Sequence, residues 1–302
     1  GGPTATGKTA LSVALAKRFG GEIISADSMQ IYQGLDVGTA KVTPEEMQGV
    51  PHHLVGFLAP EQAFSVADFT TLAGKTITQL TAQGKLPLVV GGTGLYITSL
   101  LNGIGFTPEK VDPAIRQELQ ARLQAEGSQA LYAELAAVDP GYAAKVHPNN
   151  TPRVIRALEL YRATGRKMSA EREAARPAEN PYRSLCLCLT CRDRTLLYQR
   201  IDTRCDRMMQ SGILEEAKLV YDHRDTYRTA AQAIGYKEFF PYFEQTASLE
   251  ACADKLKQAS RNYAKRQLTW FRHMDGVVWL DAGAPEVQQC ACRTVQRFLS
   301  KG

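Results

Sequence analysis

The sequence predicts an α/β protein in which a parallel sheet is flanked by helices and an all-helical domain is inserted into the chain. Strand and helix signals alternate over residues 1–104, capped helices fill 105–182, and an apolar strand returns at 185–190. Such alternation is typical of parallel sheets, because a parallel strand is reached through a crossover connection. We therefore expect an α/β core formed by 1–104 and 183–302, and a helical domain formed by 105–182.

The elements of the core follow from hydrophobic periodicity and from turn residues. Within 1–104 we expect a helix at 10–16, a strand at 22–27, a helix at 68–83 closed by Gly84, a strand at 86–90 and a helix after Gly91-Gly92-Thr93-Gly94. After the returning strand we expect amphipathic helices at 193–223, 228–241 and 248–272, a strand at 277–280 and a terminal helix.

The helices of the inserted domain are defined by their caps. Asp112-Pro113 places a capping residue before a proline at the first helical position, and Gly127 ends that helix. The helices that follow run from Ser128 to the residue before Asp139-Pro140, and from Thr151, with Pro152 at the first position, to Thr164-Gly165.

Residues Gly2–Thr9 fit the phosphate-loop pattern G-x-x-x-x-G-K-[ST], and an apolar helix follows directly. The glycines of such a loop let backbone N–H groups converge on a diphosphate, and the helix N-terminus adds partial positive charge. Lys8 supplies a full charge, and the Thr9 hydroxyl is a candidate ligand for Mg²⁺. A chance match in a structural turn is the alternative. The motif predicts a P-loop NTPase-like sheet that binds a diphosphate, without identifying that ligand as ATP.

Only Gly1 precedes the loop, whereas such a loop ordinarily follows a buried central strand. We expect a weaker sheet core where that first strand is missing. None of the motifs used here lies in it.

Composition indicates a globular protein of a reducing cytoplasm. Seven cysteines, an odd number, argue against a disulfide framework. Cys188 and Cys191 form a C-x-x-C pair, but no second pair with zinc spacing follows, so strand core is favoured over a metal or redox site. No stretch approaches the ~20 apolar residues that cross a bilayer, and no signal peptide is visible.

Asp27 ends the first predicted strand, at the sheet edge where ligands bind. A carboxylate beside a diphosphate could ligate Mg²⁺ or accept a proton from a substrate amine; a helix N-cap is the alternative. The strand at 86–90 ends in Gly91-Gly92-Thr93-Gly94, without the acidic residue that phosphate-loop ATPases use for Mg²⁺. This argues against a motor or helicase ATPase. The glycines indicate either close approach of a substrate or a plain helix-entry turn.

Basic residues gather in three helical stretches, and their distribution says more than the modest net charge of +5. Residues 255–274 contain no acidic side chain and interleave Tyr263, Trp270 and Phe271. Such helices suit RNA phosphates and stacked bases, although a solvated face explains any single one. Three beside a diphosphate site favour an anionic polymer. The basic residues are Arg153, Arg156, Arg162, Arg166, Lys167; Arg192, Arg194, Arg200, Arg204, Arg207; and Lys255, Lys257, Arg261, Lys265, Arg266, Arg272.

A set of motifs occurs in one order along nearly the whole chain. Besides Gly2–Thr9 it comprises residues 25–32 (SADSMQIY), 36–41 (DVGTAK), 51–54 (PHHL), 90–96 (VGGTGLY), 147–149 (HPN), 153–159 (RVIRALE), 234–238 (IGYKE) and 264–272 (AKRQLTWFR). With this set the sequence resembles the bacterial tRNA dimethylallyltransferases (isopentenyl-adenosine tRNA transferases). It differs in lacking the first strand, and in Asn150-Thr151-Pro152-Arg153 where the family has Asp-Pro-Gln-Arg.

The resemblance implies transfer of a dimethylallyl group from dimethylallyl diphosphate to N6 of the adenosine 3′-adjacent to the anticodon (position 37) of tRNA. It implies Asp27 as the proton acceptor at N6, and Thr4 and Arg204 as catalytic contacts to the pyrophosphate. The diphosphate would bind Gly2, Pro3, Thr4, Ala5, Thr6, Gly7, Lys8, Thr9 and Arg204, with Mg²⁺ as cofactor on Thr9. The helical domain would bind the anticodon stem-loop. The protein is expected to be a cytoplasmic monomer. The implied tRNA contacts are Asp27, Ser28, Met29, Gln30, Thr93, Arg116, Pro152, Arg153, Val154, Ile155, Arg156, Lys265 and Arg266.

Two other function classes stay open on the residues alone. A small-molecule phosphotransferase of the nucleotide-kinase type would need a nucleoside-binding lid and would turn over ATP with a small acceptor. A non-catalytic RNA-binding protein that uses the loop as a nucleotide switch would bind RNA in a nucleotide-dependent way, and Asp27→Ala would leave that binding intact.

Overall fold

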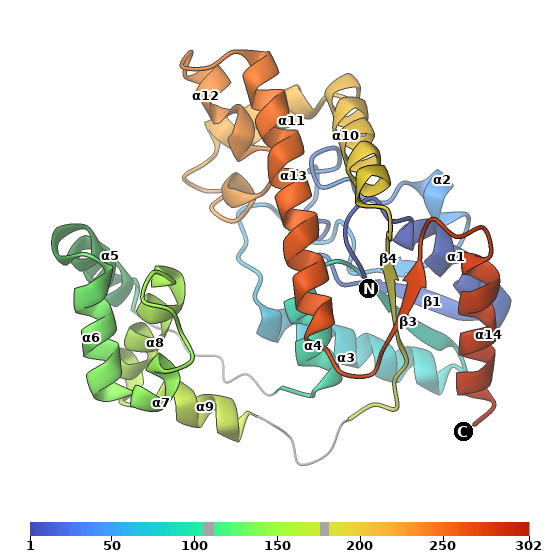
Figure 1. Ribbon diagram of the computed structural model, residues 1–302, viewed down its shortest axis with the longest axis horizontal. Helices are drawn as coiled ribbons and strands as arrows, with labels where there is room; N and C mark the ends of the chain where they lie inside the picture. The colour runs from blue at the N-terminus through green and yellow to red at the C-terminus, as the bar shows by residue number, and fades with distance from the viewer. Residues whose placement is uncertain (105–111, 176–180, 302) are drawn as a thin grey trace. The chain divides into compact units, whose positions relative to one another are not determined.

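The computed structural model describes residues 1–104, 112–175 and 181–301 and divides into two compact units. Unit 1 consists of Gly1–Leu101 and Tyr182–Gly302, and unit 2 consists of Asn102–Pro181. The boundaries predicted from the sequence fall after residues 104 and 182. The chain leaves unit 1 after α4 (Gly94–Leu101) and re-enters it before β4 (Cys186–Thr190) (Figure 1).

Unit 1 is built on parallel strands. β1 (Gly21–Ser25) lies between β2 (His52–His53) and β3 (Leu86–Val90) and pairs with both in parallel. β4 pairs in parallel with β5 (Val277–Asp281). These strands and the helices around them confirm the expected α/β class with a parallel sheet.

Gly1 continues the pairing of β4. Its nitrogen donates to the Leu187 carbonyl at 2.6 Å, and its carbonyl accepts from the Leu189 N–H at 3.0 Å, as in a parallel ladder. Gly2 follows with a φ of 131°, and a Cβ atom there would lie 2.6 Å from the Leu189 carbonyl oxygen. Because only glycine fits so close an approach, the phosphate-loop sequence is anchored on β4 at its first residue.

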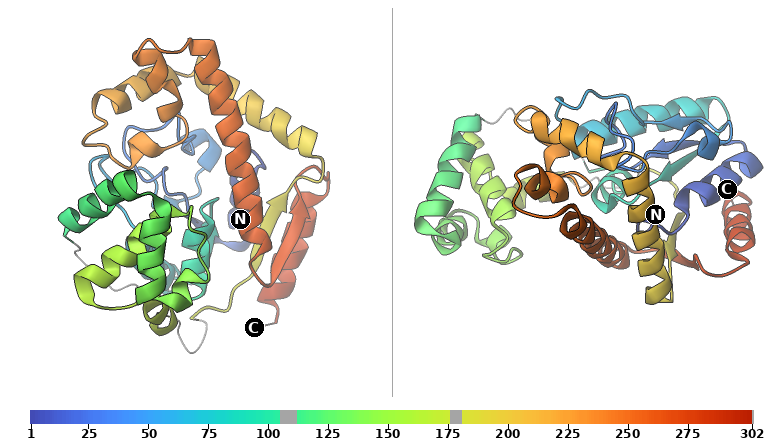
Figure 2. Two further views of the ribbon diagram at one scale, coloured as in Figure 1. Left: turned by 60° about the vertical axis from the view of Figure 1, so that its left-hand side comes forward. Right: turned by 90° about the horizontal axis from the view of Figure 1, so that it is seen from above.

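Helices cover the strands of unit 1. α1 (Lys8–Phe19) starts from the loop and buries Val13 and Ala16 against Ile23 of β1. α13 (Leu249–Arg272) packs along α10 (Arg194–Gln210), as Figures 1 and 2 show. None of the helices described combines the length and apolar character needed to cross a membrane. The other helices of unit 1 are α2 (Pro44–Met47), α3 (Val66–Ala82), α11 (Ile213–Asp222), α12 (Phe240–Phe243) and α14 (Val287–Leu299), with 3₁₀ turns at Ala230–Gln232 and Lys237–Phe239.

Two helix predictions in unit 1 are wrong. The helix expected over 193–223 is broken between α10 and α11, because Gly212 adopts a φ of 92°. The helix expected over 228–241 is replaced by two 3₁₀ turns and α12, because Gly235 turns the chain with a φ of 111°. A Cβ atom on Gly235 would lie 3.0 Å from the Gly38 carbonyl oxygen, so contact with a loop distant in sequence shapes this turn. The short elements β2 and α2 are additional to the prediction.

All the secondary structure described in unit 2 is helical. Leu135 and Leu158 belong to its fully buried centre. As predicted, the Asp112 carboxylate caps the first helix by accepting a backbone N–H, and Gly127 ends it. The third predicted helix begins at Thr151, and two short helices are additional to the prediction. The helices are α5 (Pro113–Glu126), α6 (Ser128–Val138), α7 (Pro140–Ala143), α8 (Thr151–Thr164) and α9 (Met168–Ala174).

Candidate active site

Residues far apart in the sequence of unit 1 enclose a pocket of about 550 Å³. It is lined by the phosphate-loop sequence, by the segments that follow β1 and β3, and by α10 and α13. The carboxyl ends of two parallel strands thus meet the loop at one site, which is where ligands bind in such sheets. The lining residues discussed below are Thr4, Lys8, Thr9, Asp27, Arg204, Lys237, Tyr263, Arg266 and Gln267.

The loop forms one wall of this pocket through residues 4–9. Left-handed backbone at Ala5 (φ 62°) and Gly7 (φ 80°) turns it, and Gly7 is the N-cap of α1. No side chain caps α1, so N–H groups of its first turn stay available beside the pocket. An anion bound there would meet both these N–H groups and the positive end of the helix dipole.

The carbonyl of Pro3 holds two side chains of the loop close to its backbone. It accepts hydrogen bonds from Thr6 Oγ1 at 2.8 Å and from Lys8 Nζ at 2.6 Å. Thr6 therefore has its backbone N–H, rather than its hydroxyl, to offer a ligand. Gly2 and Pro3 themselves are buried behind the pocket wall.

Lys8 and Arg204 bring two positive charges to the pocket. Burial, followed by the charge of Arg204, lowers the pKa of Lys8 to about 8, and Asp27 opposes this shift. Burial also lowers the pKa of Arg204, again opposed by Asp27. Among the described residues, no hydrogen bond or ion pair engages the Arg204 guanidinium. Two desolvated cations in one pocket favour an anionic ligand of more than one charge.

The affinity of the free protein for inorganic pyrophosphate is expected to fall between pH 7 and pH 9. With a pKa of about 8, the charged fraction of Lys8 drops from about nine-tenths to about one-tenth, so that Kd rises by up to roughly tenfold. Calorimetry at constant ionic strength measures this. Lys8→Arg keeps its charge over the range and should give a much flatter profile; an equal fall in that variant would assign the effect to another group.

Asp27 lies directly beyond β1 and faces the same pocket. Its Oδ1 accepts the N–H groups of Met29 at 2.9 Å and Gln30 at 3.3 Å. No helix begins there, so the carboxylate closes a turn and the helix N-cap alternative is wrong. Oδ2 has no hydrogen-bond partner in the part of the chain that the structure describes. One oxygen therefore fixes the side chain and leaves the other to accept from a ligand.

The segment after Asp27 is tied to the turn after β3. Thr93 Oγ1 accepts the N–H of Ser28 at 3.1 Å and lies 3.4 Å from Ser28 Oγ. Tyr263 of α13 lines the same pocket, and burial, followed by the charge of Asp27, raises its pKa to about 12. The phenol is therefore neutral at physiological pH. Tyr263 is interleaved in the acid-free basic stretch, but Gln267 carried no signal of its own in the sequence.

The loop that bears Gly38 forms another part of the wall. The Glu216 carboxylate of α11 accepts three consecutive N–H groups, from Asp36 at 2.7 Å, Val37 at 2.9 Å and Gly38 at 2.8 Å. The hydroxyl of Tyr236 donates to Glu216 at 2.5 Å, and burial, followed by the charge of Glu216, raises the pKa of Tyr236. This part of the wall is therefore held by one side chain from a neighbouring helix.

Thr9, the predicted ligand of Mg²⁺, lies on the wall at the start of α1. In residues 1–104, 112–175 and 181–301, no three His, Cys, Asp or Glu side chains converge as a metal cage. The pocket suits Mg²⁺ that is held partly by a diphosphate, because Mg²⁺ keeps several waters and takes phosphate oxygens as ligands.

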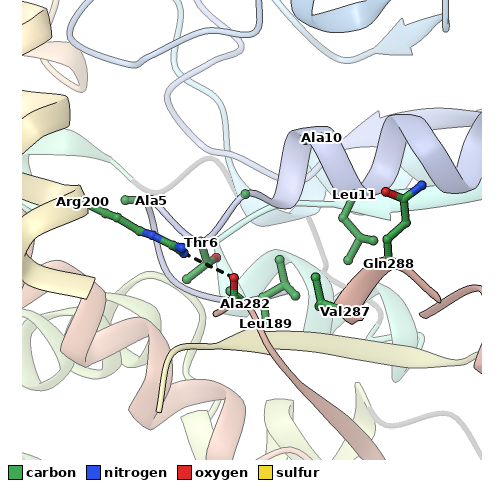
Figure 3. Close-up of a pocket in the computed structure, with 10 residues that line it drawn as sticks. Ala5, Thr6, Ala10, Leu11, Leu189, Arg200, Ala282, Val287 and Gln288 are labelled. Atoms are coloured by element: carbon green, nitrogen blue, oxygen red, sulfur yellow. Dashed lines mark hydrogen bonds between the residues drawn. The ribbon is translucent and has the colours of Figure 1, made fainter. Parts of the chain in front are cut away.

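A second pocket of about 400 Å³ shares Ala5–Gly7 with the first and is bordered by Leu189 and by α14. Arg200 reaches into it and donates to the Ala282 carbonyl at 3.4 Å (Figure 3). Arg200 and Arg204 lie one turn apart on α10 but line different pockets. Only Arg204 joins the candidate site.

Some basic residues of the stretch 255–274 form ion pairs with acidic side chains, and others do not. Lys257 pairs with Asp206 and Arg261 with Asp202, both at 2.6 Å. Lys265 and Arg266 are exposed, with cation–π contacts to Tyr198 and Tyr263, and form no ion pair among the described residues. Arg266 lines the pocket, and Lys265 is its neighbour in sequence.

In unit 2, Glu159 brings two predicted tRNA contacts together. Arg116 donates to it twice, each at 3.0 Å, and Arg156 once at 2.9 Å. Val154 and Ile155, also predicted as tRNA contacts, have their side chains buried in the core of unit 2. Pro152 and Arg153 are exposed at the start of α8.

Comparisons with known proteins agree along most of the chain. A family model described as IPP transferase matches residues 30–274, and one described as isopentenyl transferase matches residues 1–55. The chain is 50% identical over 284 residues to the tRNA dimethylallyltransferase of Bacillus subtilis, covering 94% of this chain and 90% of that protein. It is 47% identical over 299 residues to that of Geobacillus thermodenitrificans, covering 99% and 94%.

Solved structures give the same result. The tRNA isopentenylpyrophosphate transferase of Bacillus halodurans superposes with a TM-score of 0.73 at 44% identity, covering 99% of this chain and 95% of that chain. A eukaryotic dimethylallyltransferase acting on tRNA superposes with a TM-score of 0.83 at 31% identity, covering 99% of this chain and 78% of that chain.

Proposed function

The chain belongs to the IPP transferase family, and we propose that it transfers a dimethylallyl group from dimethylallyl diphosphate to N6 of adenosine 37 in tRNA. The relatives confirm the resemblance read from the sequence motifs, and with it the class of enzyme, a transferase that modifies tRNA. The modified position, the reacting residues and the metal are part of the proposal.

One observation carries the proposal at the level of chemistry. A single pocket brings together a wall of loop N–H groups, two cations, Lys8 and Arg204, and a carboxylate with a free oxygen, Asp27. The first set suits a diphosphate leaving group. The second suits an amine that must lose a proton while it attacks.

In the proposed reaction, the bond between C1 of the dimethylallyl group and its diphosphate oxygen breaks, and a bond between C1 and N6 forms. The electron pair of the broken bond leaves with the diphosphate. The N6 proton passes to Asp27, which also orients an amine whose lone pair is delocalised into the adenine ring. Negative charge grows on the leaving group, so Lys8, Arg204 and the loop amides stabilise the transition state more than the ground state.

The remaining site residues are assigned within this proposal. Thr4 contacts the diphosphate from the loop wall, and Thr9 together with diphosphate oxygens would hold Mg²⁺, which neutralises charge on the leaving group. We propose that unit 1 is a P-loop NTPase-like core and that unit 2 is an inserted domain which binds the anticodon stem-loop. The proposed tRNA contacts are Asp27, Ser28, Met29, Gln30, Thr93, Arg116, Pro152, Arg153, Arg156, Lys265 and Arg266.

The decisive experiment follows radiolabel from dimethylallyl diphosphate into unmodified tRNA with Mg²⁺. The expected product carries label on the adenosine 3′-adjacent to the anticodon, and a tRNA with guanosine at that position is the matched control. Label elsewhere in the tRNA would reject the position. Absence of label together with ATP turnover on a small acceptor would favour a kinase, and nucleotide-dependent tRNA binding without any turnover would favour an RNA-binding switch.

Salt should weaken tRNA binding steeply, because the proposed contacts are largely to phosphates. About four phosphate contacts correspond to a loss of affinity of roughly 10²-fold between 50 and 200 mM salt. Filter binding over a salt series measures the slope of log K against log salt. Lys265→Ala should reduce that slope by about 1, whereas Lys257→Ala, whose ammonium is already paired with Asp206, should leave it nearly unchanged. Equal slopes in all three proteins would remove Lys265 from the contact surface.

A further inference from the structure

Gln267 of α13 is buried between the phosphate-loop sequence and the turn after β3, with 5% of its surface exposed. Its Oε1 accepts the N–H of Thr4 at 2.9 Å, and its Nε2 donates to the Gly92 carbonyl at 3.0 Å. The two ends of one amide therefore serve two partners of opposite hydrogen-bonding character. Only one orientation of the amide satisfies both.

Gly92 has no side chain at the point where the Gln267 amide meets the backbone. A Cβ atom on Gly92 would lie 2.0 Å from Gln267 Nε2, so the glycine creates the space in which the amide sits. The N–H of Thr4 is occupied by Gln267 and cannot donate to a diphosphate. Anion binding is thereby left to the later N–H groups of the loop, and Thr4 faces the pocket from a fixed backbone.

The same contact continues to the segment that follows β1. Gly92 precedes Thr93, whose hydroxyl accepts the N–H of Ser28, the residue after Asp27. A continuous path of hydrogen bonds and short backbone links therefore runs from Thr4 through Gln267 to Asp27. It connects the wall that faces the donor diphosphate with the carboxylate that faces the acceptor amine.

We propose that Gln267 is a positioning residue that sets the separation between the diphosphate-binding loop and Asp27. The inference rests on the proposed function, in which C1 of the donor must lie in line between the leaving oxygen and N6. The rate of such a nucleophilic displacement depends on the alignment of the reacting atoms, and a misplacement of about 1 Å can lower the rate by ~10²-fold. Gln267 touches neither substrate in this scheme and acts through the backbone of Thr4 and Gly92.

The first test is Gln267→Met, which keeps the length of the side chain and removes both hydrogen bonds. We expect kcat for label transfer to fall by about 10- to 10²-fold, while Kd for dimethylallyl diphosphate and for tRNA changes by less than about threefold, within the usual context-dependent scatter. Gln258→Met, at an exposed position of the same helix, is the matched control and should leave all three constants unchanged. A thermal unfolding curve of each variant establishes that the protein assayed is folded.

The second test, Gln267→Glu, has a signature that a purely structural role lacks. A protonated carboxyl can accept from Thr4 and donate to Gly92 as the amide does, whereas an ionised one places a charged acceptor against the Gly92 carbonyl. The ratio of parent to variant kcat should therefore be small near pH 5.5 and rise toward pH 7. The charged side chains that line the same pocket, Asp27, Lys8, Arg204, Lys237 and Arg266 among them, are present in both proteins, so the ratio isolates the change made at position 267. The Tyr263 phenol, with a pKa of about 12, does not titrate in this range.

The outcomes separate the inference from the function on which it rests. If the parent protein transfers no label, the proposed function fails. If the parent is active and Gln267→Met retains kcat within twofold, or loses activity only through weaker substrate binding, the positioning role is wrong. A ratio that is constant with pH for Gln267→Glu would likewise overturn it.

Discussion

Replacing Asp27 with asparagine is expected to lower kcat for label transfer by ~10²–10⁴ while Kd for tRNA changes little. Asparagine keeps an oxygen that can accept from the N–H groups of Met29 and Gln30, so the turn survives. It cannot take up the proton that N6 releases. Single-turnover assays at saturating dimethylallyl diphosphate and tRNA, together with filter binding, separate the two quantities.

Asp27→Ala serves as the comparison, because it removes the turn contacts as well as the base. If loss of the base dominates, both variants should show similar losses in kcat, with tRNA binding weakened further only in Asp27→Ala. A variant Asp27→Asn with near-normal turnover would show that another group accepts the proton. Loss of tRNA binding in Asp27→Asn would instead place Asp27 in recognition rather than chemistry.

Arg204→Ala is expected to lower kcat/KM for dimethylallyl diphosphate by about 10²-fold or more. The guanidinium is half-buried, faces the pocket and has no ion-pair partner in the described chain, so it is held ready for an anion. Its loss removes charge where the leaving group gains it. Steady-state kinetics with donor varied at saturating tRNA gives the effect.

Two further variants sharpen this test. Arg207→Ala, on the exposed side of the same helix and outside the pocket lining, is the control for a general effect on α10. Arg204→Lys retains the charge but not the paired donors, and an intermediate loss is expected. Unchanged donor kinetics in Arg204→Ala would move the pyrophosphate contact to Lys237 or Lys8, the other cations of the pocket that do not belong to α13.

The fold was predictable wherever local signals decide it. Residues 86–90 form β3 at the predicted bounds, and α13 begins and ends within one residue of the predicted 248–272, because strong periodicity and a Ser248 cap coincide there. The failures lie where tertiary contact overrides periodicity. This holds for the turn at Gly235, which packs on Gly38 and cannot be read from the amphipathic pattern around it. The break at Gly212 is local by contrast, because its left-handed backbone favours glycine, which periodicity alone does not register.

The candidate site was predictable in part for the same reason. Asp27 and Thr93 are expected at one sheet edge because parallel strands bring their carboxyl ends together. Asp27 lines the pocket with the loop, and Thr93 accepts the N–H of the neighbouring Ser28. The amide of Gln267 meets Thr4 across 263 positions of sequence, and no local pattern announces such a contact. The sequence also does not show which lysines form ion pairs. Lys257 and Lys265 lie in the same basic stretch, but Lys257 pairs with the Asp206 carboxylate and Lys265 lies over the Tyr198 ring.

The hydrogen bonds that the Glu216 carboxylate accepts from three consecutive N–H groups link the pocket to the stability of α11. Since the amides of Asp36, Val37 and Gly38 are all received by one carboxylate of α11, they cannot exchange with solvent until that carboxylate withdraws. Withdrawal requires local opening of α11 or rupture of its contact with Tyr236. Residues 36–38 and α11 therefore form one cooperative unit. The free energy of opening this unit limits how often this part of the pocket wall opens in the absence of substrate.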